Sequence, residues 1–173
     1  CYGDGGAVFT NNEEYAEKIK MMRVHGQNKR YHHKYIGMGG RLDTIQAAIL
    51  LAKLPHYQKE LEARQKVAEN YTNILSYSFK TPVIKAKRSS AWAQYTIRVN
   101  NRDYLQSKLK DNGIPTAVYY PISLHLQECF RYLNYKKNDF PISEQASKEV
   151  MSLPMNSFLK NKEINYICSH LKS

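Results

Sequence analysis

The stretch LDTIQAAILLAKL, residues 42–54, constrains the fold of this sequence more than any other. It is apolar on nearly every side of a helix, and a helix without a polar face is expected to be buried. Pro55 follows it and is expected to interrupt or kink the helix, because proline has no backbone N–H to donate. Without the rest of its surroundings, this stretch would expose hydrophobic surface or self-associate.

Beyond Pro55 the sequence predicts an amphipathic helix and then a mixed α/β region. One helix face recurs at steps of three and four residues, at Tyr57, Leu61, Arg64, Ala68, Tyr71 and Leu75. Strand candidates follow at residues 81–84, 93–99 and 116–119. Helices are expected at residues 102–111, from a Ser143 cap to about residue 150, and from an Asn161 cap to about residue 171. This alternation predicts a small α/β layer domain.

The first forty residues combine short elements with a long loop. Residues 6–10 predict a strand, and Asn11 or Asn12 is expected to cap a helix that runs to about Val24. The sequence HGQNKRYHHKYIGMGGR then follows, polar, basic and rich in glycine, and it predicts a loop. Loops of this length in compact proteins are often functional.

Composition narrows the class of protein. The chain has 173 residues and opens on Cys1 without a signal-peptide pattern, so we interpret it as a fragment of a longer protein. No stretch approaches the roughly 18 to 20 apolar residues that span a bilayer, and the three unpatterned cysteines indicate a reducing cytoplasm. The formal net charge of +11 favours anionic partners. The hypothesis of a nucleic-acid-binding module rests on this charge alone, since the sequence shows no recognisable nucleic-acid-binding fold.

The glycine-bearing loop is the best candidate for anion binding. Gly37, Gly39 and Gly40 would let backbone N–H groups approach a ligand closely, and Arg41 offers a planar fork of donors just before a helix begins. A structural interpretation stays open at this point. In that interpretation the glycines form a tight turn and Arg41 pairs with a carboxylate.

The sequence YYPISLHLQ carries the second group of candidates. His125 has a pH-responsive imidazole, but a single histidine without a nearby Asp or Cys makes no triad and is more often structural. Tyr119 and Tyr120 are expected first to be strand residues with one ring buried. Only secondarily are they expected to stack on a sugar or bind its hydroxyls. No metal site is expected, because the adjacent His32 and His33 point to different sides and lack a Cys or acidic partner at ligand spacing.

Seven segments carry a resemblance that covers nearly the whole chain. In order, they are CYGDGGAVFT, VHGQ, IGMGGRLDTIQAAILLAKLPH, RQKVAENY, AQYTIRV, NGIPTAVYYPISLHLQ and LPM. Together they strongly resemble the DegT/DnrJ/EryC1/StrS family of sugar aminotransferases. The resemblance implies the C-terminal part of an α/β, fold-type I aminotransferase that uses pyridoxal 5'-phosphate. Residues 1–55 would then be a remnant of the large cofactor-binding domain with the start of a long interdomain helix, and residues 56–173 the small C-terminal α/β domain.

The resemblance also implies a reaction and an assembly. The amino group typically passes from L-glutamate to a keto group of a nucleotide-linked hexose, for surface-glycan or amino-sugar biosynthesis. The family acts as a homodimer in the cytoplasm with active sites at the subunit interface, and neither nucleic acid nor a membrane is an expected partner. The Schiff-base lysine of the family pattern lies shortly before the position of Cys1. This chain alone is therefore expected to be inactive.

The loop departs from the family pattern at one position. The family's G-x-N-x-R reads Gly37-Met38-Gly39-Gly40-Arg41 here, with Gly39 where an Asn is expected to reach the cofactor phosphate bound by the partner subunit. Arg41 is retained and is expected on the phosphate or substrate side. The resemblance places Tyr120 and His125 at the sugar-nucleotide site. The alternative is a non-catalytic remnant or pseudoenzyme with a binding or dimerising role.

Overall fold

The computed structural model describes residues 2–172, so that Cys1 and Ser173 lie outside the described residues. Its contacts divide the chain into an N-terminal unit, residues 1–57, and a C-terminal unit, residues 58–173. The fold is mixed α/β with one long helix, α2 (Thr44–Leu75), whose residues belong to both units. None of the helices within residues 2–172 is long and apolar enough to cross a membrane.

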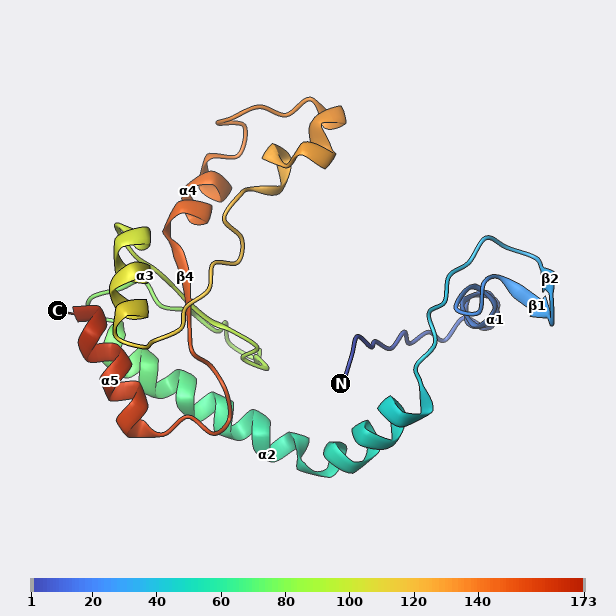
Figure 1. Cartoon of the computed structure of the whole chain (residues 1–173), viewed down its shortest axis with the longest axis horizontal. Coiled ribbons are helices and arrows are strands. Elements are labelled where there is room, and N and C mark those ends of the chain that lie inside the picture. Colours follow the sequence, from blue (N-terminus) through green and yellow to red (C-terminus); the bar gives the residue numbers. More distant parts are fainter. Residues whose placement is uncertain (1, 173) are drawn as a thin grey trace. The chain divides into compact units, whose positions relative to one another are not determined.

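The N-terminal unit contains a helix and a small antiparallel hairpin (Figure 1). The helix α1 (Glu13–Met22) begins where predicted, because the Asn12 side chain accepts the backbone N–H of Tyr15 at 3.0 Å. The strands β1 (Gln27–Lys29) and β2 (His32–His33) form the hairpin. The strand predicted at residues 6–10 is wrong: a strand needs a pairing partner, and no segment of residues 2–172 pairs with this one.

The long helix α2 differs from its prediction in two ways. Pro55 lies inside the helix and does not interrupt it, because proline removes one hydrogen bond while the flanking turns keep theirs; the alternative expectation, a kink at Pro55, stays a prediction. The apolar stretch before Pro55 is not buried: Ile45, Leu51 and Leu54 are 76%, 71% and 66% exposed. Among the described residues, every buried hydrophobic side chain lies between residues 67 and 171, so the N-terminal unit offers no core to cover this stretch. The expected exposed hydrophobic surface is confirmed.

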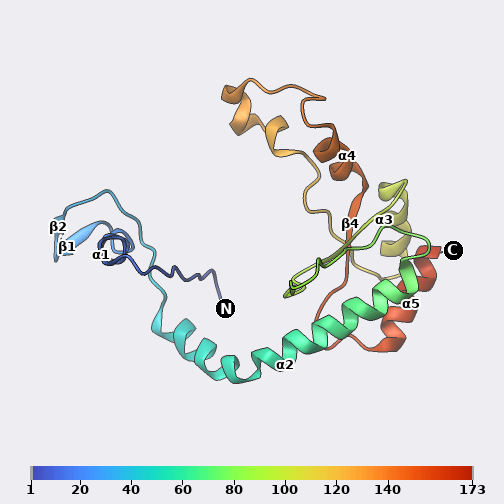
Figure 2. The same ribbon diagram turned by 180° about the vertical axis from the view of Figure 1, so that it is seen from behind.

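The C-terminal unit is a layer of helices on a two-stranded antiparallel sheet. The strands are β3 (Tyr95–Arg98) and β4 (Val150–Leu153), paired from Tyr95 opposite Leu153 to Arg98 opposite Val150. Helices α3 (Arg102–Asp111) and α5 (Asn161–Lys172) contact each other, as Figures 1 and 2 also show. The predicted face of α2 enters this core, since Ala68, Tyr71 and Leu75 are buried with Tyr95.

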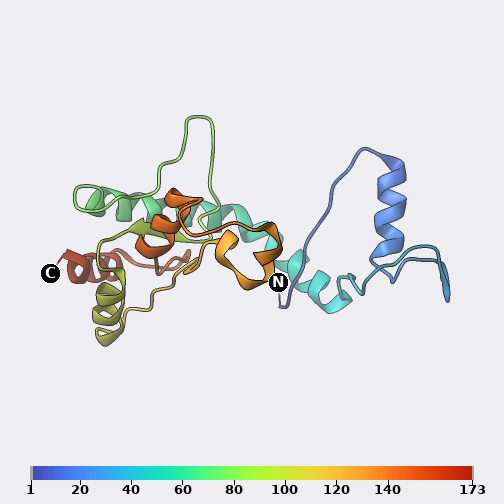
Figure 3. The ribbon, with the colours of Figure 1, turned by 90° about the horizontal axis from the view of Figure 1, so that it is seen from above.

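Several predicted boundaries change in this unit. The helix at residues 102–111 and the strand within 93–99 are confirmed. Residues 81–84 and 116–119 form no strand. An isolated bridge joins Lys80, just before the first segment, to Arg98, and another joins Ala117, within the second segment, to Ser152. Residues 81–91 instead form a long projecting loop (Figure 3), and Trp92 after it is buried in the core. The strand β4 was not predicted, because its pairing partner is distant in the sequence.

The two predicted N-terminal helix caps in this unit, Ser143 and Asn161, fail for local reasons. Helix α4 (Pro141–Glu149) begins two residues before Ser143, with proline as its first residue. Helix α5 begins at Asn161, whose side-chain oxygen accepts a hydrogen bond from Asn70 at 2.9 Å instead of capping. Two short 3-10 helices, η1 (Leu124–Leu126) and η2 (Glu128–Leu133), lie in the segment that leads to α4 (Figure 2).

Candidate functional site

The glycine-bearing loop of the N-terminal unit is held by backbone pairing with the residues that end α1. The Met38 N–H donates to the Met22 carbonyl at 2.9 Å, and the Gly40 N–H donates to the Arg23 carbonyl at 2.8 Å. Gly39 lies between them and is bridged to Val24 in antiparallel fashion. In such a pairing, the N–H of the intervening residue points away from the paired segment. The Gly39 N–H therefore faces outward, while the N–H groups of Met38 and Gly40 donate hydrogen bonds within the protein.

Gly37 and Gly39 are glycines for different reasons. A Cβ atom at Gly37 would overlap the backbone N of Gly26 and the carbonyl O of Met22, so close backbone packing requires glycine there. A Cβ atom at Gly39 would meet nothing nearer than Cε1 of His25 at 3.4 Å, which is an ordinary contact. The structural interpretation of the loop thus explains Gly37 and leaves Gly39 unexplained, since a side chain fits at that position.

Arg41 lies at the end of this loop and is exposed. Within residues 2–172 no carboxylate pairs with its guanidinium, so the alternative in which Arg41 serves a structural ion pair is not found. A planar cation two residues along the same loop from an outward backbone N–H is a combination of donors that suits a phosphate group. The residues present therefore suit an anion such as a phosphate group, with a backbone N–H and no side-chain donor at Gly39.

Gln46, in the first turns of α2, ties the beginning of the chain to this region. Its side-chain N–H₂ donates to the carbonyls of Tyr2 and Asp4 at 3.3 and 3.2 Å, and its oxygen accepts the Asp43 N–H at 3.2 Å. Gly3 has a φ of +121°, and a Cβ atom there would lie 2.7 Å from the Gln46 nitrogen. Sequence reasoning missed Gln46, which the surrounding apolar run concealed.

His125, in the C-terminal unit, is held inside a polar cluster. Its side chain is 7% exposed, and its Nε2 lies 3.0 Å from Oε1 of Glu144, whose side chain is 8% exposed. The same oxygen accepts the Asn138 N–H at 2.7 Å, and the Phe140 ring packs on the imidazole at 4.8 Å between centroids. Burial alone would raise the pKa of Glu144, but hydrogen bonds from Asn138 and His125 outweigh it and hold the pKa below its ordinary value.

The two tyrosines before His125 are both exposed, at 45% for Tyr119 and 71% for Tyr120. The prediction that one of these rings is buried is wrong for this chain, because the segment that carries them belongs to no strand and lies outside the core. The exposed Tyr120 hydroxyl is free to meet a ligand in solution.

The predicted site residues fall into two groups. Gly39 and Arg41 share one loop of the N-terminal unit, while Tyr120 and His125 share one segment of the C-terminal unit. Within the described residues, no cluster of three or more His, Cys, Asp or Glu side chains could hold a metal ion.

Comparison with known proteins gives one consistent result. The model of the DegT/DnrJ/EryC1/StrS aminotransferase family matches residues 1–172. The UDP-2-acetamido-2-deoxy-3-oxo-D-glucuronate aminotransferase of Pseudomonas aeruginosa is 45% identical over 172 residues, which are 99% of this chain and 47% of that protein. The chain thus spans about half the length of the relatives it matches.

Solved structures agree with the sequence match. A DegT DnrJ EryC1 StrS aminotransferase from Brucella abortus superposes with a TM-score of 0.86 at 38% identity, over 95% of this chain and 44% of that one. NtdA from Bacillus subtilis, solved with bound cofactor PMP, has a TM-score of 0.82 at 25% identity, over 94% of this chain and 40% of that one.

Proposed function

Because this chain belongs to the DegT/DnrJ/EryC1/StrS aminotransferase family, we propose that it is the C-terminal part of an enzyme that aminates a nucleotide-linked keto-sugar. The proposed amino donor is L-glutamate and the proposed cofactor is pyridoxal 5'-phosphate. The name of the Pseudomonas aeruginosa relative supports the sugar-nucleotide substrate, and the PMP bound to NtdA supports the cofactor.

One observation in the structure carries the proposal. The Arg41 guanidinium is exposed and has no carboxylate partner within residues 2–172, although it ends a loop whose backbone is well fixed. An unpaired arginine on a fixed loop is suited to a phosphate or carboxylate supplied from elsewhere.

The proposed enzyme is a homodimer of a longer chain. In it, residues 1–55 complete a large cofactor-binding domain and residues 56–173 form the small domain. The exposed apolar side chains of α2 before Pro55 support this. Neighbouring exposed side chains such as Ile45, Leu51 and Leu54 are usually buried against another domain or subunit. The unpaired thiols of Cys129 and Cys168 suit a reducing cytoplasm, which we propose as its location.

Each candidate residue has a proposed task. Arg41 and the Gly39 N–H hold the phosphate of the cofactor, which supplies the electron sink for amino transfer when bound. The exposed Tyr120 hydroxyl binds the sugar nucleotide. His125 fixes the segment that carries Tyr120 through its hydrogen bond to Glu144, and contact of its imidazole with substrate stays a prediction. The lysine that binds the cofactor in this family is proposed to precede Cys1, so residues 1–173 alone are inactive.

The experiment that tests this uses the full-length protein and its Arg41→Ala variant. We expect the cofactor dissociation constant to rise about tenfold or more, because one charge-assisted contact is lost, and turnover to fall with it. Arg41→Lys should recover part of the loss, since lysine keeps the charge without the planar fork. Arg131→Ala, which removes an exposed arginine of the C-terminal unit, is the matched control. Unchanged cofactor absorbance and turnover in Arg41→Ala would contradict the proposal.

Gly39 favours a second candidate, a non-catalytic relative with a binding or dimerising role. A full-length protein that carries the upstream lysine but neither binds pyridoxal phosphate nor transfers an amino group would establish this alternative.

A further inference from the structure

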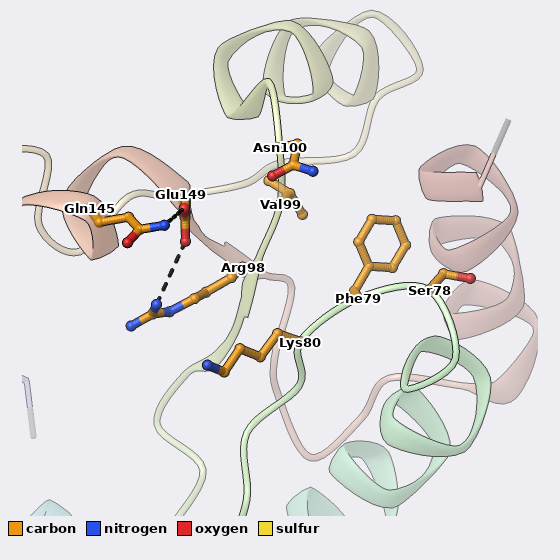
Figure 4. Close-up of a pocket in the computed structure, with 8 residues that line it drawn as sticks. All are labelled: Ser78, Phe79, Lys80, Arg98, Val99, Asn100, Gln145 and Glu149. Carbon is orange, nitrogen blue, oxygen red and sulfur yellow. Dashed lines mark hydrogen bonds and ion pairs between the residues drawn. The ribbon is translucent and has the colours of Figure 1, made fainter. Parts of the chain in front are cut away.

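The C-terminal unit contains a cavity that the proposed reaction does not use. Its volume is about 430 Å³, within the range of sites for small molecules. Three elements build it: the segment after α2, the end of β3 with the residues that follow, and the last turns of α4 (Figure 4). The lining residues are Ser78, Phe79, Lys80, Arg98, Val99, Asn100, Gln145 and Glu149.

The backbone around this cavity is fixed by hydrogen bonds. The Arg98 N–H donates to the Lys80 carbonyl at 3.0 Å, and the Val99 N–H donates to the Glu149 carbonyl at 3.0 Å. The three elements are therefore joined through β3, and the side chains that line the cavity start from positions that are held relative to one another.

The charges at the cavity do not cancel. Glu149 is its one acidic lining residue, and its two oxygens are engaged: Oε2 lies 3.6 Å from the Arg98 guanidinium and Oε1 accepts the Gln145 amide at 2.7 Å. Lys80 is exposed, and no carboxylate within residues 2–172 pairs with its ammonium group. Figure 4 shows the Lys80 and Arg98 side chains extending along the same side of β3. The cavity thus keeps one positive charge in excess.

We propose that this cavity binds a small molecule through a phosphate or carboxylate group held between Lys80 and Arg98. The 3.6 Å ion pair with Glu149 uses one nitrogen of the Arg98 guanidinium, which has further N–H donors to offer an anion. Asn100 and Gln145, which also line the cavity, provide amide groups for the polar atoms of the ligand.

The test uses the full-length protein with ¹³C-labelled valine methyl groups and does not depend on enzyme activity. Inorganic phosphate and 2-oxoglutarate are titrated separately, each against sodium chloride at the same ionic strength. We expect one or both anions to shift the Val99 methyl signals in a saturable way. Saturation at lower concentration with inorganic phosphate identifies a phosphate ligand, and with 2-oxoglutarate a carboxylate ligand. The Val67 methyl signals, which report on the buried core, should stay in place.

Variants then separate the cavity from general charge effects. Lys80→Ala should weaken binding of the anion about tenfold, because a charged hydrogen bond is removed. Lys110→Ala, which removes an exposed lysine near the end of α3, should leave binding unchanged. The proposal is overturned if neither anion gives a saturable shift at Val99, if chloride gives the same shift, or if Lys80→Ala binds as tightly as the parent protein. None of these results bears on Arg41 or on the cofactor.

Discussion

Nε2 of His125 lies 3.0 Å from Oε1 of Glu144, and both side chains are more than nine-tenths buried. The hydrogen bond joins η1 to α4 across 19 residues, and it anchors the segment that carries Tyr119 and Tyr120. A buried carboxylate needs partners of this kind, because an unpaired one would carry a large desolvation penalty. The histidine that resembles a substrate ligand in the sequence is therefore also part of the unit's framework.

Replacement of Glu144 by Gln should lower the thermal stability of the full-length protein in a pH-dependent way. Because hydrogen bonds hold the pKa of Glu144 below its ordinary value, its carboxylate stabilises the fold above that value, and the contribution is lost as pH falls through the lowered pKa. The difference in melting temperature between the parent and Glu144→Gln should be largest near neutral pH and shrink below about pH 4. Melting curves across this range check it.

The control for this prediction is Glu128→Gln. Glu128 is 83% exposed and pairs with the exposed Arg131, so its removal should change the free energy of unfolding by no more than about 0.5 kcal/mol. A stability difference for Glu144→Gln that is constant with pH would contradict the assigned role of the carboxylate.

Replacement of Tyr71 by Phe should weaken the core of the C-terminal unit. The Tyr71 hydroxyl donates to the Pro154 carbonyl at 3.0 Å, and burial raises the pKa of this phenol, so it remains a donor at neutral pH. Removing it leaves the carbonyl without that donor, at a loss of about 0.5–1.5 kcal/mol. Tyr132→Phe, at a ring that is 72% exposed, should cost nothing measurable. Equal denaturation midpoints for the parent and Tyr71→Phe would count against this hydrogen bond.

The two described cysteines should differ in their reactivity toward alkylating reagents. Burial raises the pKa of the Cys168 thiol to about 11, from an ordinary value of 9.0, which reduces its thiolate fraction about a hundredfold. Cys129 is exposed. N-ethylmaleimide at mildly alkaline pH should modify Cys129 first, as measured by peptide mass spectrometry over time. The rates should converge in denaturant, and a faster reaction at Cys168 in the folded protein would refute the burial of its thiol.

Local signals explain which elements could be predicted from the sequence. Asn12 caps α1 and Asn112-Gly113 ends α3, and both act on backbone groups only a few residues away. The strand β4 lacked such a signal, because a four-residue strand is specified by its partner β3, which lies more than fifty residues earlier. Residues 6–10 have a strand-like composition, but composition does not supply a pairing partner, and these residues form no strand.

The candidate site shows the same difference between local sequence signals and contacts that join distant residues. Gly39 and Arg41 are neighbours in the sequence, so their joint exposure in one loop could be anticipated from the motif. The partnership of His125 with Glu144, and that of Gln46 with Tyr2 and Asp4, depend on how separate elements pack. No spacing rule connects residues at such separations, and only the three-dimensional structure brings them together.

The last prediction concerns the position where this chain departs from its family. Gly39→Asn should be tolerated by the fold, because an added Cβ atom would meet only the His25 ring at 3.4 Å. The backbone at Gly39 is not in the left-handed region that favours glycine. In the full-length protein the new side-chain amide would add one donor beside Arg41. We expect pyridoxal phosphate to bind about tenfold more tightly, as one hydrogen bond to a charged group allows, with the dissociation constant measured by cofactor absorbance.

Gly37→Asn is the matched control, since it places the same side chain two residues earlier. There the Cβ atom would overlap the backbone of Gly26 and Met22, so the loop must move and cofactor binding should weaken. Tighter binding in Gly39→Asn together with weaker binding in Gly37→Asn would show that the loop geometry and its missing donor limit phosphate affinity. If Gly39→Asn folds but binds the cofactor no better than the parent, the Gly39 position does not face the phosphate, and the assignment of this loop to the cofactor must be abandoned.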